Sequence, residues 1–142
     1  MTVKHLDHLN MTVKNLKETI EWYQRVFGFE IVEDGTWKGA PWAIIRSGDA
    51  MLCIYEHPEL TAIDDDGAPS HHINHFGLRI TDQEKWEETL ERESVRVHYG
   101  PYRWPHSTAW YVCDPTGYEI EVALWDNDRV TFDNAPVASL VK

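Results

Sequence analysis

The chain has 142 residues, of which 42% are hydrophobic and 26% are charged, and these values fit one globular domain with its own core. The formal net charge of -11 argues against nucleic acid or an anionic membrane surface as a partner. No stretch approaches the roughly 18 apolar residues of a membrane span, and residues 1–9 lack the apolar core of a signal peptide. The isolated cysteines, Cys53 and Cys113, favour a reducing compartment, so we expect a cytoplasmic protein.

Hydrophobic patterns in the first half of the chain predict the element order β-α-β-β-β. Residues 5–13 alternate in polarity as a strand does. A helix is predicted to follow, with an N-cap at Asn15, apolar residues at helical spacing and a C-cap at Gly28. Asp34-Gly35 indicates a turn. The remaining strands of this half are predicted at residues 29–33, 41–46 and 50–56.

The same order of elements is predicted again after a polar loop at residues 57–71. A strand at residues 73–80 leads into a helix that Thr81 and Glu84 would open as a capping box. Residues 100–106 are rich in aromatic residues and proline, and we expect a loop there. The other strands of this half are predicted at residues 95–99, 108–113 and 118–125.

The two halves form an internal repeat, because His75 follows His8 by the same number of residues as Asp82 follows Asn15. Each half alone would leave one face of its sheet uncovered. We therefore expect an α+β fold in which paired βαβββ modules form curved sheets around a central, metal-containing cavity, with the helices outside. The chain would be a single domain at residues 1–142, with its modules and its C-terminal tail at about residues 3–57, 72–125 and 126–142.

Two histidines and one glutamate occupy notable places in this repeat. His8 and His75 lie on the first strand of each module, and Glu121 lies on the last strand, after the turn at residues 114–117. Alternation places all three on the face opposite the aliphatic residues, where a carboxylate needs charge or hydrogen bonds to offset desolvation. A single histidine on a strand is more often a surface residue. Two imidazoles and one carboxylate together are typical of a facial ligand set for a divalent metal.

These motifs resemble the vicinal oxygen chelate superfamily, which includes glyoxalases, extradiol dioxygenases and fosfomycin- and bleomycin-resistance proteins. The resemblance covers about residues 3–125, and it is carried by residues 7–13, 22–29, 74–78 and 114–121. It implies metal ligands at His8, His75 and Glu121, and a metal that binds two neighbouring substrate oxygens as a Lewis acid. Small members usually dimerise. We therefore expect a homodimer with a small-molecule substrate, and neither a nucleic-acid nor a membrane partner.

Two departures from the superfamily's patterns bear on the choice of reaction. Glyoxalase-like members carry a fourth ligand, a glutamate, at a position that falls at or near Cys53, with Glu56 lying beyond it. Fosfomycin-resistance transferases usually have threonine where this chain has Asn10. They also have a lysine before the penultimate strand, and none lies between Arg92 and Glu121. The first departure leaves three metal ligands, the number that fosfomycin-resistance transferases also use, and the second argues against phosphonate binding.

The segment at residues 100–106 resembles that of extradiol dioxygenases. Tyr111 lies ten residues before Glu121, a spacing that both dioxygenases and resistance transferases use for an active-site tyrosine. The hydroxyl of Tyr111 could bond a metal-bound substrate oxygen, although a core aromatic is an equally good interpretation. A dioxygenase also needs an acid/base near the metal. His57 and His106 are the candidates, and for each the alternative is an ordinary loop histidine.

The sequence thus predicts a divalent-metal-dependent enzyme of glyoxalase/extradiol dioxygenase type that acts on a small molecule with vicinal oxygens. We favour a ring-cleaving dioxygenase with Fe2+, while Mn2+, Ni2+ and Zn2+ suit the same ligands. A glyoxalase-like lyase or isomerase and a fosfomycin-type thiol transferase are alternatives. A metal-free, drug-binding module of the bleomycin-resistance type is a further alternative, although such members usually lack the three ligands.

Overall fold

A computed structural model describes residues 4–59 and 73–133 of the chain. The first module comprises β1 (Leu9–Val13), α1 (Leu16–Phe27), β2 (Glu30–Trp37), β3 (Ala40–Ser47) and β4 (Ala50–Glu56). The second comprises β5 (Phe76–Ile80), α2 (Gln83–Arg92), β6 (Val97–Arg103), β7 (Ser107–Cys113) and β8 (Glu119–Trp125), followed by a 3-10 turn, η1 (Asp126–Asp128). Neither helix of these residues has the length and apolar character that a membrane span requires.

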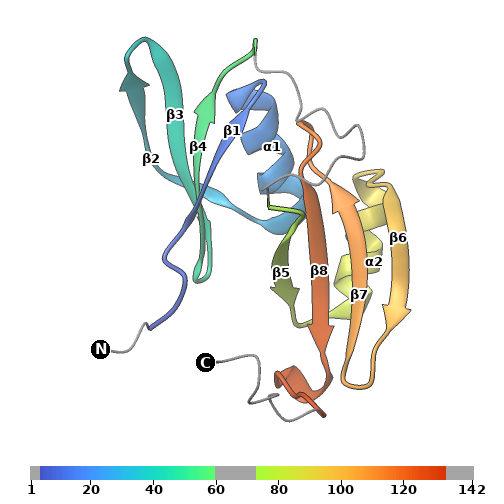
Figure 1. Ribbon diagram of the computed structural model, residues 1–142. Helices are drawn as coiled ribbons and strands as arrows, with labels where there is room; N and C mark the ends of the chain where they lie inside the picture. The colour runs from blue at the N-terminus through green and yellow to red at the C-terminus, as the bar shows by residue number, and fades with distance from the viewer. Residues whose placement is uncertain (1–3, 60–72, 134–142) are drawn as a thin grey trace, which may run out of the picture.

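Each module forms its own four-stranded sheet, with strand orders β1-β4-β3-β2 and β5-β8-β7-β6 (Figure 1). The first strand of each module runs parallel to the last strand, whereas the other neighbours are antiparallel. Two equivalent βαβββ units result. The predicted α+β class and the paired modules are therefore confirmed.

The helix ends follow from local hydrogen bonding. The side chain of Asn15 accepts a hydrogen bond of 2.9 Å from the backbone N–H of Glu18 and begins α1, as predicted. Gly28 ends α1 in the left-handed conformation, at φ 65°, which glycine adopts without steric cost. At α2 the capping box predicted at Thr81 was off by one residue. The N-cap is Asp82, the equivalent of Asn15 in the repeat, and its side chain accepts a hydrogen bond of 3.1 Å from the backbone N–H of Lys85.

Strand pairing overrides local turn signals at two places. Asp34-Gly35 lies inside β2, because Gly35 pairs with Trp42 of β3, and the turn occurs instead at Lys38-Gly39. Residues 100–103 were predicted as loop, yet β6 continues to Arg103 after a shift in its register with β7. The predicted loop at residues 57–71 lies mostly outside the described residues.

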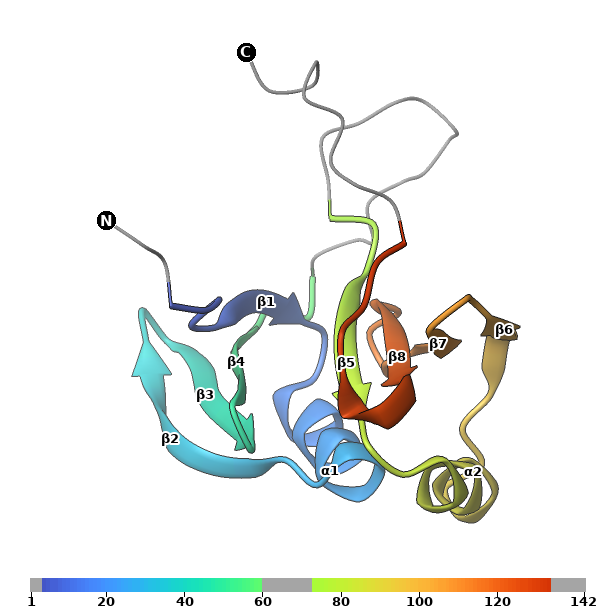
Figure 2. The ribbon, with the colours of Figure 1, turned by 90° about the horizontal axis from the view of Figure 1, so that it is seen from below.

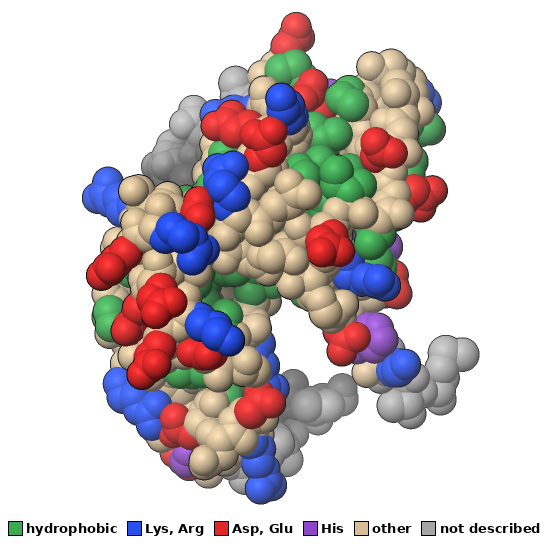
Figure 3. Space-filling model, turned by 180° about the vertical axis from the view of Figure 1, so that it is seen from behind, with side chains coloured by type: hydrophobic (Ala, Val, Ile, Leu, Met, Phe, Trp, Pro, Cys, Tyr) green, Lys and Arg blue, Asp and Glu red, His purple; other side chains and the backbone are tan. Residues whose placement is uncertain are grey.

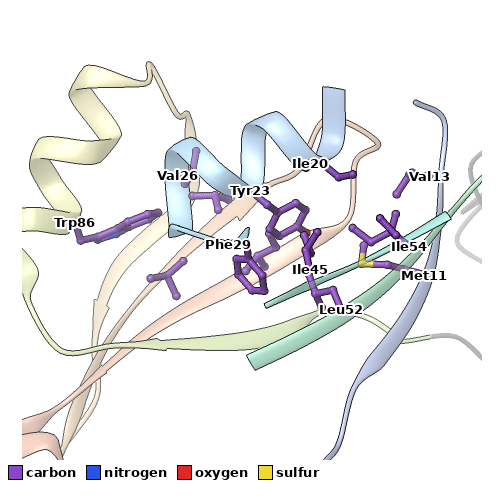
Figure 4. Close-up of a cluster of buried hydrophobic side chains, with 14 of the residues drawn as sticks. Met11, Val13, Ile20, Tyr23, Val26, Phe29, Ile45, Leu52, Ile54 and Trp86 are labelled. Atoms are coloured by element: carbon purple, nitrogen blue, oxygen red, sulfur yellow. The ribbon is translucent and has the colours of Figure 1, made fainter. Parts of the chain in front are cut away.

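One hydrophobic core joins the two modules, and α1 lies at its centre. Ile120 and Val122 are fully buried on one face of β8, as their alternation predicts, and they belong to the same cluster as Tyr23 of α1. Figure 4 shows side chains of α1 between those of the sheets and Trp86 of α2. The ring of Phe27 stacks on that of Trp86, with centroids 5.4 Å apart.

This core determines where the polar faces of the sheets lie. Since α1 fills the angle between the sheets (Figure 2), the faces that carry His8 and Glu121 are turned away from the shared core. All eight residues of β2 are exposed within a single chain. The central, metal-containing cavity that the repeat suggested therefore stays a prediction, since α1 lies between the two sheets in the part of the chain that the structure describes.

Candidate metal centre

The polar face of the second sheet is built by strand register. Glu121 of β8 lies between Gly77 of β5 and Tyr111 of β7, and its side chain points away from the buried residues on either side of it. Tyr111 in turn pairs with Tyr99 of β6, so these four paired residues form one row across the sheet. His75 immediately precedes β5 and lies two residues before Gly77, on the same face of the sheet.

His75 and Glu121 are brought together by this register. The Nε2 atom of His75 lies 3.1 Å from Oε2 of Glu121, and its Nδ1 atom lies 3.6 Å from Oε1 of Glu119. The side chains of His75 and Glu121 are 37% and 27% exposed, so an ion could reach both. At 3.6 Å Glu119 is a charged neighbour of the second imidazole nitrogen rather than a hydrogen-bond partner, and it lies on the side from which carboxylates commonly orient histidine ligands.

Tyr111 adjoins this pair. Its ring meets that of His75 edge-to-face, with centroids 5.5 Å apart. Burial raises the pKa of the Tyr111 hydroxyl above its ordinary value, and the charge of Glu121 and a hydrogen bond with that carboxylate raise it further. The hydroxyl therefore keeps its proton at neutral pH and is available as a hydrogen-bond donor.

His8 lies on the other sheet and is not brought to this pair. It precedes β1, and its Nδ1 atom lies 2.9 Å from Oδ2 of Asp7. Within residues 4–59 and 73–133, no three side chains of the ligand type lie close enough to hold one ion. The complete set of His8, His75 and Glu121 therefore stays a prediction.

A cavity of about 740 Å³ adjoins Glu121 and reaches His106 and aromatic side chains that come from β8 and the segment after it. His106 Nε2 hydrogen-bonds the Asp133 carboxylate. The segment Asp126–Asp133, which follows β8, contributes Thr131, Phe132 and Asp133 to the lining of this cavity. Asp126 pairs with Arg103, and Asp128 pairs with Arg79.

His57, the second acid/base candidate, lies elsewhere. It follows β4 and is exposed, and its backbone N–H donates to the carbonyl of Val13 at 2.8 Å. Val13 ends β1, whereas His8 precedes that strand, so the two histidines lie toward opposite ends of it. The described residues thus group His106, but not His57, with Glu121.

The model of the Glyoxalase/Bleomycin resistance protein/Dioxygenase superfamily matches residues 5–122. The chain belongs to this superfamily. Three solved structures illustrate how wide it is. Lactoylglutathione lyase from Agrobacterium tumefaciens is 22% identical, with a TM-score of 0.64, and the match covers 87% of this chain and 96% of that one. At this identity the likeness shows the fold alone.

The other two structures carry different functions on the same fold. TnmS3, an antibiotic binding protein from a Streptomyces species, is 19% identical over 89% of this chain and 99% of its own, with a TM-score of 0.67. The fosfomycin resistance protein FosX from Listeria monocytogenes is 17% identical over 87% of this chain and 93% of its own, with a TM-score of 0.67. An enzyme, a binding protein and a resistance protein thus share this architecture, and fold does not choose among them.

The register of the first sheet shows how this chain departs from glyoxalase-like superfamily members. Asn10 pairs with Cys53 as Gly77 pairs with Glu121, so a buried thiol occupies the place of the carboxylate. Glu56 does not replace it, because its Oε2 atom accepts a hydrogen bond of 2.8 Å from Leu16 N at the start of α1. The resemblance to glyoxalase-like members had placed the fourth ligand position at or near Cys53, but the capping role of Glu56 was not predicted.

Members of this superfamily typically use divalent metals, and the donors on the second sheet fit such an ion. His75 supplies an imidazole nitrogen, Glu121 supplies a carboxylate oxygen, and Glu119 lies beside the imidazole. Sequence reasoning missed the contribution of residues 131–133 to the cavity and the aromatic row at Tyr99 and Tyr102. Alternation would place Tyr99 and Tyr102 on opposite faces of β6, and the register shift between them, which brings both rings to Tyr111, has no signal in the sequence.

Proposed function

We propose that the protein is a homodimeric, divalent-metal-dependent enzyme that acts on a small molecule with two neighbouring oxygen atoms. In this proposal His75 and Glu121 of one chain and His8 of a second copy hold the metal. The pairing of His75 with Glu121 at 3.1 Å, on an accessible face beside Tyr111, is the observation that carries it. The chain has two of the three donors in one place, and its repeat supplies the third on an equivalent strand.

The sheet edges support completion of the site by a second copy. Among the described residues, β1 and β5 each have a hydrogen-bonded neighbour on one side only. His8 and His75 immediately precede these equivalent strands. If β1 of one chain lay beside β5 of another, the two histidines would meet, and two-fold symmetry would create two identical sites.

The metal would supply Lewis acidity toward two adjacent substrate oxygens. The chain's own residues would then position the substrate and manage its protons. Tyr111, which keeps its proton, donates a hydrogen bond to one substrate oxygen. His106, held by Asp133 in the adjoining cavity, accepts or returns a proton. Trp104 and Trp125 line the same cavity and exclude water from it.

Ring cleavage by an iron-dependent dioxygenase is the reaction that we favour. The aromatic row beside His75 supports it, because the rings of Tyr99 and Tyr102 each lie 6.3 Å from that of Tyr111 and could face a flat substrate. A lyase or isomerase of glyoxalase type and a thiol transferase would use the same metal. Cys53 stands where glyoxalase-like members carry a glutamate, and this difference weighs against the glyoxalase reaction.

A metal-free, drug-binding protein is the second candidate function. The exposed rings of Trp37, Tyr102 and Trp104 favour it, because they offer stacking surface independently of any metal. The two candidates differ in metal dependence. A binder of this kind would keep its affinity for an aromatic drug after His75→Ala, whereas the enzyme would lose turnover.

Metal content of anaerobically purified protein, measured by elemental analysis, tests the proposal. We expect about one ion per chain, lost in both His8→Ala and Glu121→Gln. His98→Ala is the matched control, because His98 is an exposed histidine on β6, at the opposite edge of the sheet from β5. Iron would direct the next assays to catechols and oxygen uptake, and manganese, nickel or zinc to thiol transfer and isomerisation. Full metal content in His8→Ala would contradict the three-ligand site.

A further inference from the structure

We infer that the cavity beside Glu121 selects aromatic diols with an uncharged, apolar substituent and discriminates against those with an acidic one. The inference rests on the proposed function, because it takes the two diol oxygens to be held at the metal. The cavity has a volume of about 740 Å³, toward the upper end of the range of about 300–1,000 Å³ for small-molecule sites. It therefore has room for a substituent beyond the ring that is cleaved.

Aromatic side chains line this cavity and are only partly covered. Phe132 is 77% exposed and Trp104 is 51% exposed, although both contribute to the lining. The ring of Trp125 meets that of Phe132 edge-to-face, with centroids 5.7 Å apart. Exposed apolar side chains that gather in one place commonly mark a site for a ligand or a partner. An apolar substituent would bury part of these rings, whereas a charged one would lose its hydration there.

Contacts within one chain hold the last part of this lining in place. The segment Asp126–Asp133 follows β8 and begins with η1 (Figure 1). The backbone N–H of Asp126 donates to the carbonyl of His106 at 2.9 Å, and the Asp126 carboxylate pairs with Arg103. A single chain therefore places Phe132 at the cavity, without help from a second copy.

The charges around the cavity disfavour an acidic substituent. Glu121 and Asp133 both line it, and among the described residues no lysine or arginine does. His106, the basic side chain of the lining, already bonds the Asp133 carboxylate. Ser107 and Thr131 are polar but carry no charge that would offset the carboxylates. Acidic side chains are also spread over the outer face shown in Figure 3, in keeping with the formal net charge of -11, and this field opposes the approach of an anion.

Three catechols that differ only in one side chain test this preference. The side chain of 4-isobutylcatechol is apolar, that of 3,4-dihydroxyphenylacetamide is polar but uncharged, and that of 3,4-dihydroxyphenylacetate has nearly the same shape and is anionic. Oxygen uptake by the metal-loaded protein would give kcat/KM for each. We expect the isobutyl compound to exceed the acetate about tenfold or more, and the amide to exceed it about threefold. The gap between amide and acetate should narrow as the ionic strength rises, because salt screens the carboxylates.

Equilibrium binding separates this inference from the proposed reaction. Quenching of tryptophan fluorescence under anaerobic conditions should rank the three compounds in the same order, whether or not the ring is cleaved. That order without any oxygen uptake would refute ring cleavage and support the selectivity of the cavity. Oxygen uptake with equal kcat/KM for all three would leave the proposed function standing and overturn the inference. Binding of none of the three would overturn both.

Phe132→Ala and Val130→Ala are a matched pair of variants. Both residues lie in the segment after β8 and are exposed, but of the two only Phe132 lines the cavity. We expect Phe132→Ala to lower the ratio of kcat/KM for the isobutyl compound to that for the amide about threefold or more, and Val130→Ala to leave this ratio unchanged. Equal ratios in the two variants, or an acetate that is used as well as the amide, would overturn the inference.

Discussion

The hydroxyl of Tyr23 donates a hydrogen bond of 3.3 Å to Oδ2 of Asp114, and this buried contact joins the helix of the first module to the turn of the second. The other carboxylate oxygen of Asp114 accepts three backbone hydrogen bonds, from Thr116, Gly117 and Tyr118. One carboxylate therefore both shapes the turn before β8 and holds α1 against it. Since β8 carries Glu121, this contact also supports the position of the candidate metal ligand.

Replacement of Tyr23 by phenylalanine should destabilise the protein without changing its fold. The variant keeps the ring in the core but removes the donor to a buried carboxylate, and we expect a loss of about 1–2 kcal/mol in the free energy of unfolding. Urea denaturation with an unchanged m-value would check this. Tyr99→Phe, at an exposed ring, should unfold as the unaltered protein does.

Asp114 should also make stability depend on pH. Burial raises its pKa above the ordinary 3.8, although the hydrogen bonds from the turn and from Tyr23 oppose that rise. The folded state therefore binds this proton more tightly than the unfolded state does. The stability that this group contributes is fully present when the pH is below the ordinary pKa, and it is lost as the pH rises through the raised pKa of the folded state. Unfolding free energies at about pH 4 and about pH 7 should differ less in Asp114→Asn than in the unaltered protein, and an unchanged difference would count against this role.

Tyr111→Phe should lower turnover while leaving metal binding intact. The hydroxyl keeps its proton at neutral pH, so its loss removes a donor beside the metal site, and we expect kcat to fall about 100-fold. Oxygen uptake with a catechol, together with elemental analysis, would measure both effects. Tyr102→Phe, which retains its ring, should have little effect on kcat, and equal losses in the two variants would refute a special role for Tyr111.

Mixing two inactive variants should restore metal binding if the site is shared between chains. After joint refolding of His8→Ala and Glu121→Gln in equal amounts, half of the dimers would pair unlike chains. Each mixed dimer would hold one intact site and one defective site, so about a quarter of the normal metal content should return. Mixing His75→Ala with Glu121→Gln is the control, because every resulting site would lack one of these ligands. Recovery in the control, or none in the test mixture, would contradict the shared site.

Glu56→Ala should reduce stability but not metal content. Its carboxylate accepts a hydrogen bond from Leu16 N at the first turn of α1, and loss of such a cap costs about 1 kcal/mol. Thermal unfolding and elemental analysis of the same preparation would separate the two effects. A fall in bound metal would instead make Glu56 a ligand.

Periodicity predicted most of the local structure because the signals were themselves local. Asn15 begins α1 and Gly28 ends it, through contacts within one helical turn. The alternation of β8 correctly assigns Ile120 and Glu121 to opposite faces of the sheet. The repeat likewise paired Asn15 with Asp82, and these residues are the N-caps of the two helices. These predictions require no knowledge of distant parts of the chain.

The relation between the two sheets could not be predicted in this way. Alternation indicates the face on which His8 or His75 lies, but not which sheet that face meets. The position of α1 depends on the contacts of Tyr23 with Asp114 and of Phe27 with Trp86, which no pattern in the sequence marks. The row at Tyr99 and Tyr102 was missed for a related reason, since pairing with β7 extends β6 past a local loop signal.

The segment Asp126–Asp133 could be exchanged without changing either sheet. It is attached to the second sheet by the pairs of Asp126 with Arg103 and Asp128 with Arg79, it contains only the 3-10 turn η1, and its residues 131–133 line the cavity beside Glu121. Exchanging this short segment would reshape the cavity beside Glu121 and leave both sheets as they are. Relatives with the same two sheets and different sequences here would thus present different pockets, which makes this segment the natural place to engineer selectivity.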